Sequence, residues 1–270
     1  MPLFNEIDCA QLMRLIGTPD APVLIDLRIP ADLAADAVLI PTATCMPHSD
    51  IRAAAAGLRD RHVVLICHRG RKISHGAAAQ LRLDGVRAEV LTGGMVAWRE
   101  AGVPVVPVAA IPAHIEGSTL WVTRHRPKID RIACPWLIRR FIDPQARFLF
   151  VPPADVPTVA EVFGATPFDI EGVFWSHRGT GCTFDTMLAE FGLQTEPLAR
   201  LALVVRGADT DAHDLTPQAA GLLAMSVGLS RLYRDDIEQL AAAMPLYDAL
   251  YRWARDGSDE GHDWPAGKPA

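Results

Sequence analysis

The sequence lacks most of the features that mark membrane, secreted or nucleic-acid-binding proteins. No apolar run approaches the roughly 18–20 residues that cross a bilayer, so no membrane span is expected. The five cysteines are odd in number and widely spaced, unlike a disulfide framework. A net charge of −6 argues against a nucleic-acid partner. The first residues carry no secretion-signal pattern, so we expect a cytoplasmic protein with reduced thiols.

Apolar residues make up 50% of the 270-residue chain, which is enough for one large or two medium-sized cores. Before about residue 110, short apolar segments alternate with helical patterns. This alternation is typical of an α/β domain with a parallel sheet and flanking helices. Strands are expected at 23–28, 37–41, 63–67 and 88–91, and a helix at 74–84.

Longer helical patterns dominate the second half and predict an α+β domain rich in helices. These helices are expected at 130–142, 184–193, 196–208, 216–232 and 235–256, with short strands at 119–125 and 147–152. The domains are expected to cover residues 1–108 and 118–256, joined by an extended, Pro- and Ala-rich linker at 109–117. We expect the tail, residues 257–270, to be disordered.

The segment after the strand at 63–67 carries the clearest chemical signal. Cys67 ends a buried strand and begins a turn of six residues before the helix. In such a turn, successive N–H groups converge on one point and the helix N-terminus adds partial positive charge, which favours a thiolate. The alternative is a buried, inert cysteine that closes the strand. Gly70, Arg71 and Lys72 are hard to explain by packing and favour the reactive thiolate.

Three motifs resemble the rhodanese (sulfurtransferase) family over roughly residues 5–107. They are LIDLR with Asp26 and Arg28, CHRGRK at 67–72, and VLTGGMVAWREAGVPV at 90–105. The resemblance implies that Cys67 accepts a sulfane sulfur as a persulfide, which a second nucleophile then removes. It implies a thiosulfate-like donor, a thiol acceptor and no cofactor for the transfer.

The same resemblance assigns roles to the turn. Residues 68–72 are expected to cradle the anionic sulfur, and a six-residue loop fits a sulfur atom better than a phosphate. Arg71 and Lys72 add positive charge for an anionic donor, whereas His68 and Arg69 either join this site or face solvent.

Three more residues of this half are assigned around Cys67. Asp26 and Arg28 are expected to brace its loop. Cys45 is expected in a loop after a strand, where it resolves the Cys67 persulfide, forms a protective disulfide with Cys67, or has no role.

The second half resembles the C-terminal domain of the chromate-resistance protein ChrB family over about residues 118–255. The motifs that carry this resemblance are DRIACPWLIRRF at 130–141, FDIEG at 168–172, SHRGTGC at 176–182 and YDALYRWA at 247–254. It implies a role beside chromate efflux or in chromate sensing. No helix-turn-helix with a basic recognition helix is visible, so no nucleic-acid partner is expected.

A basic segment stands out in this domain. Six cations lie within seventeen residues that contain one acid, Asp130: Arg124, Arg126, Lys128, Arg131, Arg139 and Arg140. Arg131, Arg139 and Arg140 either bind an oxyanion such as chromate or sulfate, or form internal ion pairs with Asp130, Asp143 or Asp169.

A metal site is the other candidate. His177, Cys134 and Cys182 suit zinc or iron, with Asp169, Glu171 or His213 as further ligands, although the spacing matches no tight motif. The alternative places Cys134 in the core beside Ile132 and Trp136.

Together these patterns predict a rhodanese-type sulfurtransferase associated with chromate resistance or with oxyanion or sulfur stress. The alternative is a non-catalytic protein that binds or senses an oxyanion or the redox state.

Overall fold

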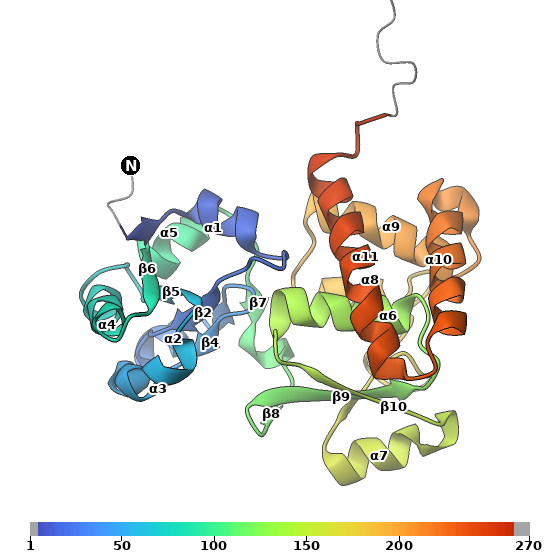
Figure 1. The fold of residues 1–270 in the computed structure, drawn as a ribbon, viewed down its shortest axis with the longest axis horizontal. Helices are drawn as coiled ribbons and strands as arrows, with labels where there is room; N and C mark the ends of the chain where they lie inside the picture. Colours follow the sequence, from blue (N-terminus) through green and yellow to red (C-terminus); the bar gives the residue numbers. More distant parts are fainter. Residues whose placement is uncertain (1–4, 262–270) are drawn as a thin grey trace, which may run out of the picture.

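The computed structural model describes residues 5–261. Figure 1 shows two domains side by side, an α/β domain that contains the N-terminus and a helix-rich domain that ends with α11. The first domain is built on a five-stranded parallel sheet in the order β1-β6-β5-β2-β4. Its strands are β1 Glu6–Ile7, β2 Val23–Asp26, β4 Thr44–Cys45, β5 His62–Ile66 and β6 Arg87–Leu91.

Helices cover both faces of this sheet, as the sequence predicts. They are α1 Cys9–Leu15, α2 Pro30–Ala35, α3 Ile51–Leu58, α4 Lys72–Leu83 and α5 Gly94–Glu100. Alternate residues of β5 point to opposite faces, so Val64 and Ile66 pack with residues of α1 and α5. Val63 and Leu65 pack with residues of α3 and α4. The two-faced burial explains why the β5 segment is a continuous apolar run.

One predicted strand of the parallel sheet is wrong. In the segment 37–41 only β3, Val38–Leu39, is extended, and it pairs antiparallel with β7, Val106–Pro107, in a separate sheet. The chain then turns at Thr42, which has a φ of 69°, and β4 takes the edge of the parallel sheet. Residues expected as an extended linker also contain β8, His114–Ile115, which pairs with the second domain.

The second domain has a small sheet centred on β9, Ser118–Arg124. β10, Arg147–Val151, and β11, Thr166–Pro167, run parallel to it, and β8 runs antiparallel. The helices are α6 Asp130–Leu137, α7 Val156–Phe163, α8 Thr183–Glu190, α9 Glu196–Asp209, α10 Gln218–Leu232 and α11 Asp236–Asp256. These elements confirm the α-dominated α+β class. The helix predicted at 130–142 changes after Leu137 to a π-helical turn, Ile138–Ile142.

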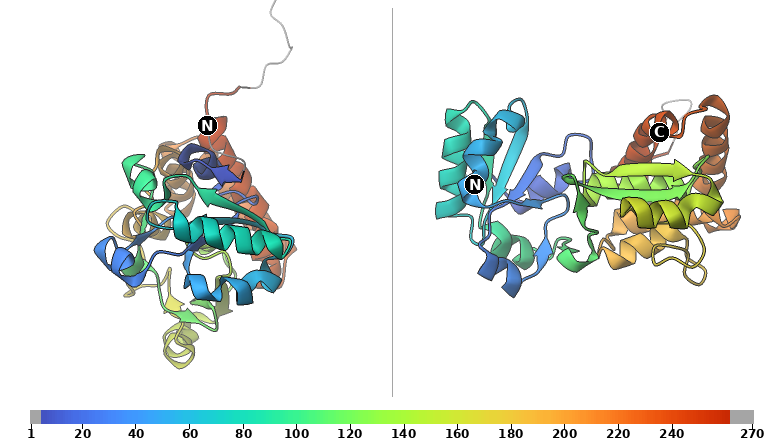
Figure 2. Two further views of the ribbon diagram at one scale, coloured as in Figure 1. Left: turned by 90° about the vertical axis from the view of Figure 1, so that its left-hand side faces the viewer. Right: turned by 90° about the horizontal axis from the view of Figure 1, so that it is seen from below.

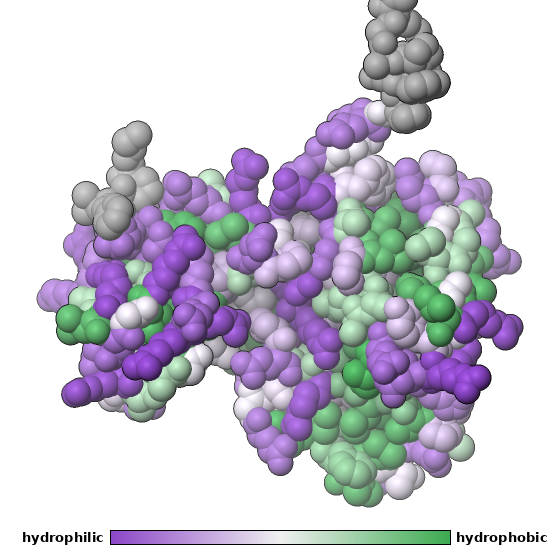
Figure 3. All heavy atoms as spheres, viewed as in Figure 1, coloured by the Kyte–Doolittle hydropathy of each residue, from purple (hydrophilic) through white to green (hydrophobic). Residues whose placement is uncertain are grey.

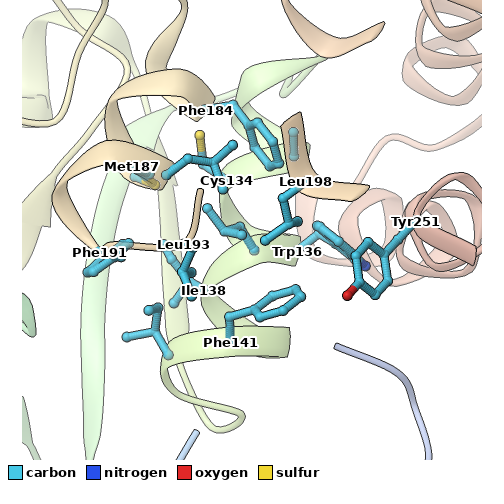
Figure 4. Packing of buried hydrophobic residues seen from close by; sticks show 14 of the residues in the cluster. Cys134, Trp136, Ile138, Phe141, Phe184, Met187, Phe191, Leu193, Leu198 and Tyr251 are labelled. Carbon is cyan, nitrogen blue, oxygen red and sulfur yellow. The ribbon is translucent and has the colours of Figure 1, made fainter. Parts of the chain in front are cut away.

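The sheet lies between α7 and the main helical core (Figure 2). Leu120 and Val122 of β9 pack with residues of α7, whereas Trp121 belongs to the core with α6, α8 and α9. Figure 4 shows the centre of this core, where Trp136 and Cys134 of α6 lie among Phe184, Leu198 and Tyr251. Helix α6 is therefore enclosed, and it positions the residues at its N-terminus.

Apolar side chains remain exposed over α7 and α10 (Figure 3). They include Val162 and Phe163 on α7, and Met225 and Leu232 on α10. Within residues 5–261, none of the helices is both long and apolar enough to cross a membrane. Part of the predicted disordered tail, residues 262–270, lies outside the described residues.

Candidate functional site

Cys67 lies at the C-terminal end of the central strand β5 and is buried. Helix α4 begins at Lys72, two residues earlier than predicted. The Arg71 N–H points at Cys67 Sγ from 3.3 Å, and Ser74 Oγ lies 3.1 Å from the same sulfur. Ser74 also donates its one O–H to the Arg71 carbonyl at 3.0 Å. While Cys67 is protonated, its S–H therefore donates to Ser74 Oγ. When Cys67 loses this proton, the Ser74 hydroxyl can rotate and donate to the sulfur anion instead.

One glycine of the 90–105 motif and one glycine of the cysteine loop allow the loop to rest on the first turn of α5. Met95 N–H donates to the Cys67 carbonyl and Val96 N–H to the His68 carbonyl, both at 3.0 Å. Gly94 has a φ of 61°, and a Cβ there would lie 2.1 Å from the Cys67 carbonyl oxygen. A Cβ on Gly70, which has a φ of 59°, would lie 2.4 Å from the Leu91 carbonyl oxygen. Glycine is required at both positions because backbone approaches backbone.

The charged side chains of the loop surround the buried sulfur at the surface. Arg69, Arg71 and Lys72 are exposed, and His68 is half-buried. The loop therefore turns backbone toward the sulfur and its cations toward solvent, where an anion would approach.

Asp26 and Arg28 form a buried ion pair beside this strand, with 2.7 Å between Arg28 Nη2 and Asp26 Oδ2. Arg28 also donates to the carbonyls of Asp36 and Val38. The pair thus holds the segment between α2 and β3, rather than the loop as predicted. Its link to the loop is indirect, because Leu27 N–H donates to the carbonyl of Ile66 at 2.7 Å.

Cys45 is an exposed residue of β4, not of a loop. It pairs with Asp26 of β2, which pairs in turn with Ile66 of β5. Two strand spacings place its Cα roughly 10 Å from that of Cys67. A disulfide needs Cα atoms within about 7 Å, so this geometry does not permit one. Although the residue is exposed, partial desolvation of its sulfur, and then the nearby Asp26, raise the pKa of the Cys45 thiol, which makes it a weak nucleophile at neutral pH.

The structure gives the three predicted anion-binding arginines separate partners. Arg131 Nε lies 3.2 Å from Asp169 Oδ2. Arg140 makes two hydrogen bonds to Asp248, at 2.7 and 2.8 Å, and Arg139 donates to the Ala146 carbonyl.

Arg139 and Arg140 also line a cavity of about 420 Å³ between the domains, together with Arg61 of the first domain. Oxyanion binding by the three arginines stays a prediction, and the structure separates Arg131 from the other two.

His177 is the centre of a carboxylate cluster in the second domain. Its Nε2 lies 3.2 Å from Asp209, 3.4 Å from Asp169 and 3.5 Å from Asp130. The hydrogen bond with Asp169, helped by the charges of Asp130 and Asp209, raises the pKa of His177 to about 9 against the effect of burial. Burial first, and then repulsion from Asp209 and Asp169, raises the pKa of Asp130.

The donor set around His177 differs from the predicted one. Among the described residues, Asp130, His177 and Asp209 offer ligand atoms within 4.8 Å of one another. The two cysteines do not join this set; burial raises the pKa of both Cys134 and Cys182, so they are thiols.

Neither of the other two candidates belongs to this set. His213 pairs with Asp211 at 3.7 Å, and Glu171 lines a cavity that His177 also lines.

Sequence reasoning missed Asp209 and considered Asp130 only as a partner for arginine. Asp209 is the last residue of α9, where the helix dipole disfavours a negative charge. An acid at a predicted helix C-terminus is a local signal that would have marked Asp209 for attention.

The parallel sheet and the cysteine loop define the first half as a rhodanese-type α/β domain. The family model described as Rhodanese-like domain matches residues 8–101. A sulfurtransferase of Allochromatium vinosum is 34% identical over 106 residues, covering 38% of this chain and 96% of that protein. The crystal structure of a rhodanese-related protein from Thermoplasma volcanium is 29% identical with a TM-score of 0.33, covering 38% of this chain and 98% of that one.

The second half matches the family model described as ChrB, C-terminal domain, over residues 121–254. Protein ChrB of Cupriavidus metallidurans is 28% identical over 216 residues, which are 75% of this chain. The chain spans 65% of the length of that relative. The chain belongs to the rhodanese family through its first domain and carries a ChrB C-terminal domain after it, as the sequence motifs predict.

Proposed function

We propose that the protein is a sulfurtransferase that carries sulfur as a persulfide on Cys67. The observation that carries this proposal is the position of Cys67 Sγ at the end of β5, with the Arg71 N–H at 3.3 Å and Ser74 Oγ at 3.1 Å. Both groups can donate to a sulfur anion. The N-terminus of α4 adds partial positive charge on the same side.

The transfer proceeds in two displacements. The Cys67 thiolate attacks the outer sulfur of a thiosulfate-like donor, the S–S bond of the donor breaks, and sulfite leaves with the bonding electron pair. An acceptor thiolate or cyanide then attacks the outer sulfur of the persulfide. Its S–S bond breaks and returns the electron pair to Cys67. Arg71 and Lys72, both exposed, draw the anionic donor to the loop.

The test compares Cys67→Ser with Cys45→Ser in the full chain. We expect the wild type and Cys45→Ser to form thiocyanate from thiosulfate and cyanide, and Cys67→Ser to form none. Intact-mass measurement after donor treatment should show one added sulfur atom on the first two proteins only. Full turnover by a folded Cys67→Ser variant would reject the assignment.

A non-catalytic sensor is the alternative, and the same sample distinguishes the two. A persulfide that passes to a small thiol acceptor indicates transfer, whereas one that stays on Cys67 indicates sensing. The exposed cations around the sulfur favour an anionic donor that arrives from solvent, which suits turnover.

We also propose that the second domain links this chemistry to chromate or a related oxyanion. The ChrB C-terminal match supports the link, and so does the cavity between the domains where Arg61, Arg139 and Arg140 meet. Calorimetry of the full chain with sulfate and chromate tests it. Arg61→Gln and Arg139→Gln should weaken binding, whereas Arg52→Gln, an exposed arginine of α3, should not. Equal affinity in the wild type and all three variants would show that these arginines do not bind the anion.

A further inference from the structure

We infer that Asp130, His177 and Asp209 form a binding site for one divalent transition-metal ion in the second domain. Their donor atoms, two carboxylate oxygens and one imidazole nitrogen, lie within 4.8 Å of one another. Three different parts of the fold supply them. Asp130 begins α6, Asp209 ends α9, and His177 lies in the loop before α8. The site is independent of the sulfur chemistry proposed for Cys67.

Asp130 provides an observation that points to a ligand beyond the cluster itself. Its side chain is fully buried, and its Oδ2 accepts the Thr183 N–H at 2.5 Å. Its Oδ1 is buried as well and accepts no N–H or O–H from any residue between 5 and 261, and the thiol of Cys182 is the further donor at this carboxylate. A thiol is a weak donor, so the buried carboxylate stays under-satisfied, and a bound cation would satisfy it.

When Asp130 and Asp209 are both ionised, the charges of the cluster do not balance without a further cation. Asp169 is neutralised by arginines, since Arg131 lies 3.2 Å and Arg124 3.4 Å from its Oδ2. Asp130 and Asp209 both form their ion pair with the same group, the imidazole of His177. Two largely buried carboxylates thus share one partner of at most one positive charge. A divalent cation supplies the charge that they need.

The site is also accessible to an ion from solvent. The His177 side chain is 43% exposed. It lines a cavity of about 670 Å³ together with Arg124 and Glu171, and a second of about 510 Å³ together with Arg206 and Thr210. Coordination positions that the three protein ligands leave open would face these cavities, where water or a small anion could complete the shell.

The donor set selects the class of metal. One imidazole and two carboxylates suit Zn²⁺, Mn²⁺ or Fe²⁺, whereas Ca²⁺ and Mg²⁺ prefer oxygen alone. Soft metals that need thiolates are disfavoured because Cys134 points into the apolar core, where Phe184 and Met187 surround it (Figure 4). Asp169 faces the same nitrogen of His177, so its hydrogen bond to that nitrogen would give way to the ion, and Arg124 and Arg131 would remain its partners.

The test uses the full chain, stripped of metal by a chelator and then titrated with Zn²⁺ or Mn²⁺. We expect one equivalent per chain by calorimetry and by elemental analysis after gel filtration. Asp209→Asn and His177→Asn should weaken binding by at least about tenfold, the loss that even outer-shell changes produce. Asp214→Asn is the matched control, because Asp214 is exposed and lies near Asp209 in the sequence.

Thermal unfolding provides the second measurement, because it shows whether each variant is folded before its metal binding is compared. The ion should raise the Tm of the wild type and of Asp214→Asn, but not of Asp209→Asn. Without metal, Asp209→Asn should be at least as stable as the wild type, since it removes one uncompensated charge. Substoichiometric binding by the folded wild type, or equal affinity in Asp209→Asn, His177→Asn and the wild type, would overturn the inference. Thiosulfate turnover is measured in parallel and should be unchanged.

Discussion

Gly94→Ala tests whether the cysteine loop depends on its contact with α5. Gly94 has a φ of 61°, and a Cβ there would lie 2.1 Å from the Cys67 carbonyl oxygen and 2.4 Å from the Gly70 nitrogen. The left-handed backbone alone costs an alanine about 1 kcal/mol. Relief of a contact more than 1 Å too short requires the loop to move, which adds about 1–3 kcal/mol. We therefore expect the free energy of unfolding to fall by about 2–4 kcal/mol.

Gly102→Ala is the matched control. Gly102 has nearly the same φ, 64°, but no atom beyond its chain neighbours lies within 4 Å of the place that a Cβ would take. It should lose only about 1 kcal/mol and keep full sulfur transfer. Urea unfolding and thiosulfate turnover measure both variants. In Gly94→Ala, a folded protein should lose activity because the displaced Cys67 carbonyl moves the sulfur away from the Arg71 N–H. Equal losses of stability in the two variants, with turnover intact, would refute this reasoning.

Three further predictions concern single side chains. Ser74→Ala removes the hydroxyl 3.1 Å from Cys67 Sγ and should slow persulfide formation about tenfold in single-turnover experiments; an unchanged rate would exclude this role. Cys45→Ser should keep normal turnover, and mild oxidation of the wild type should yield no Cys45–Cys67 disulfide by mass spectrometry. Because its pKa is raised, alkylation of Cys45 should increase as the pH rises above 9. Asp248→Ala removes both bonds to Arg140 and the acceptor of the Trp136 indole, and it should cost about 3 kcal/mol in urea unfolding, with Asp248→Asn costing less. A loss below about 1 kcal/mol would show that water replaces these bonds.

The parts of the fold that the sequence predicts well are those in which neighbours in the chain are neighbours in space. The strand β5, the loop after Cys67 and helix α4 follow one another directly, so an apolar run and its turn residues are enough to place them. The glycines at 93–94 belong to a separate motif, and only the structure shows that they support the loop. The edge strand β4 is not predicted because the turn before it has no glycine or asparagine to mark it. Thr42, a β-branched residue, takes the positive φ at this turn.

The second domain is harder to predict because its polar groups meet through tertiary packing. Arg140 pairs with Asp248, which is 108 residues away in the sequence, and no local pattern connects the two. When metal ligands are selected from the sequence by residue type alone, the cysteines are favoured over the aspartates. Position in the fold favours the aspartates instead: Cys134 and Cys182 pack in the apolar core, while Asp130, although equally buried, and Asp209 face His177. The proposed set rests on charge balance in space, which the sequence does not show.

Contacts between the domains show where an anion could be held by both. Gly17 of the first domain fits against the rings of Phe141 and Tyr251, and the Thr42 N–H donates to the Phe141 carbonyl at 2.9 Å. These contacts form part of a core that is continuous between the domains. The arginine-lined cavity lies at the same boundary, so an anion held there would touch both domains at once. Its binding would therefore depend on their docking, whereas the proposed sulfur transfer at Cys67 and the proposed metal binding at His177 would each use residues of one domain alone.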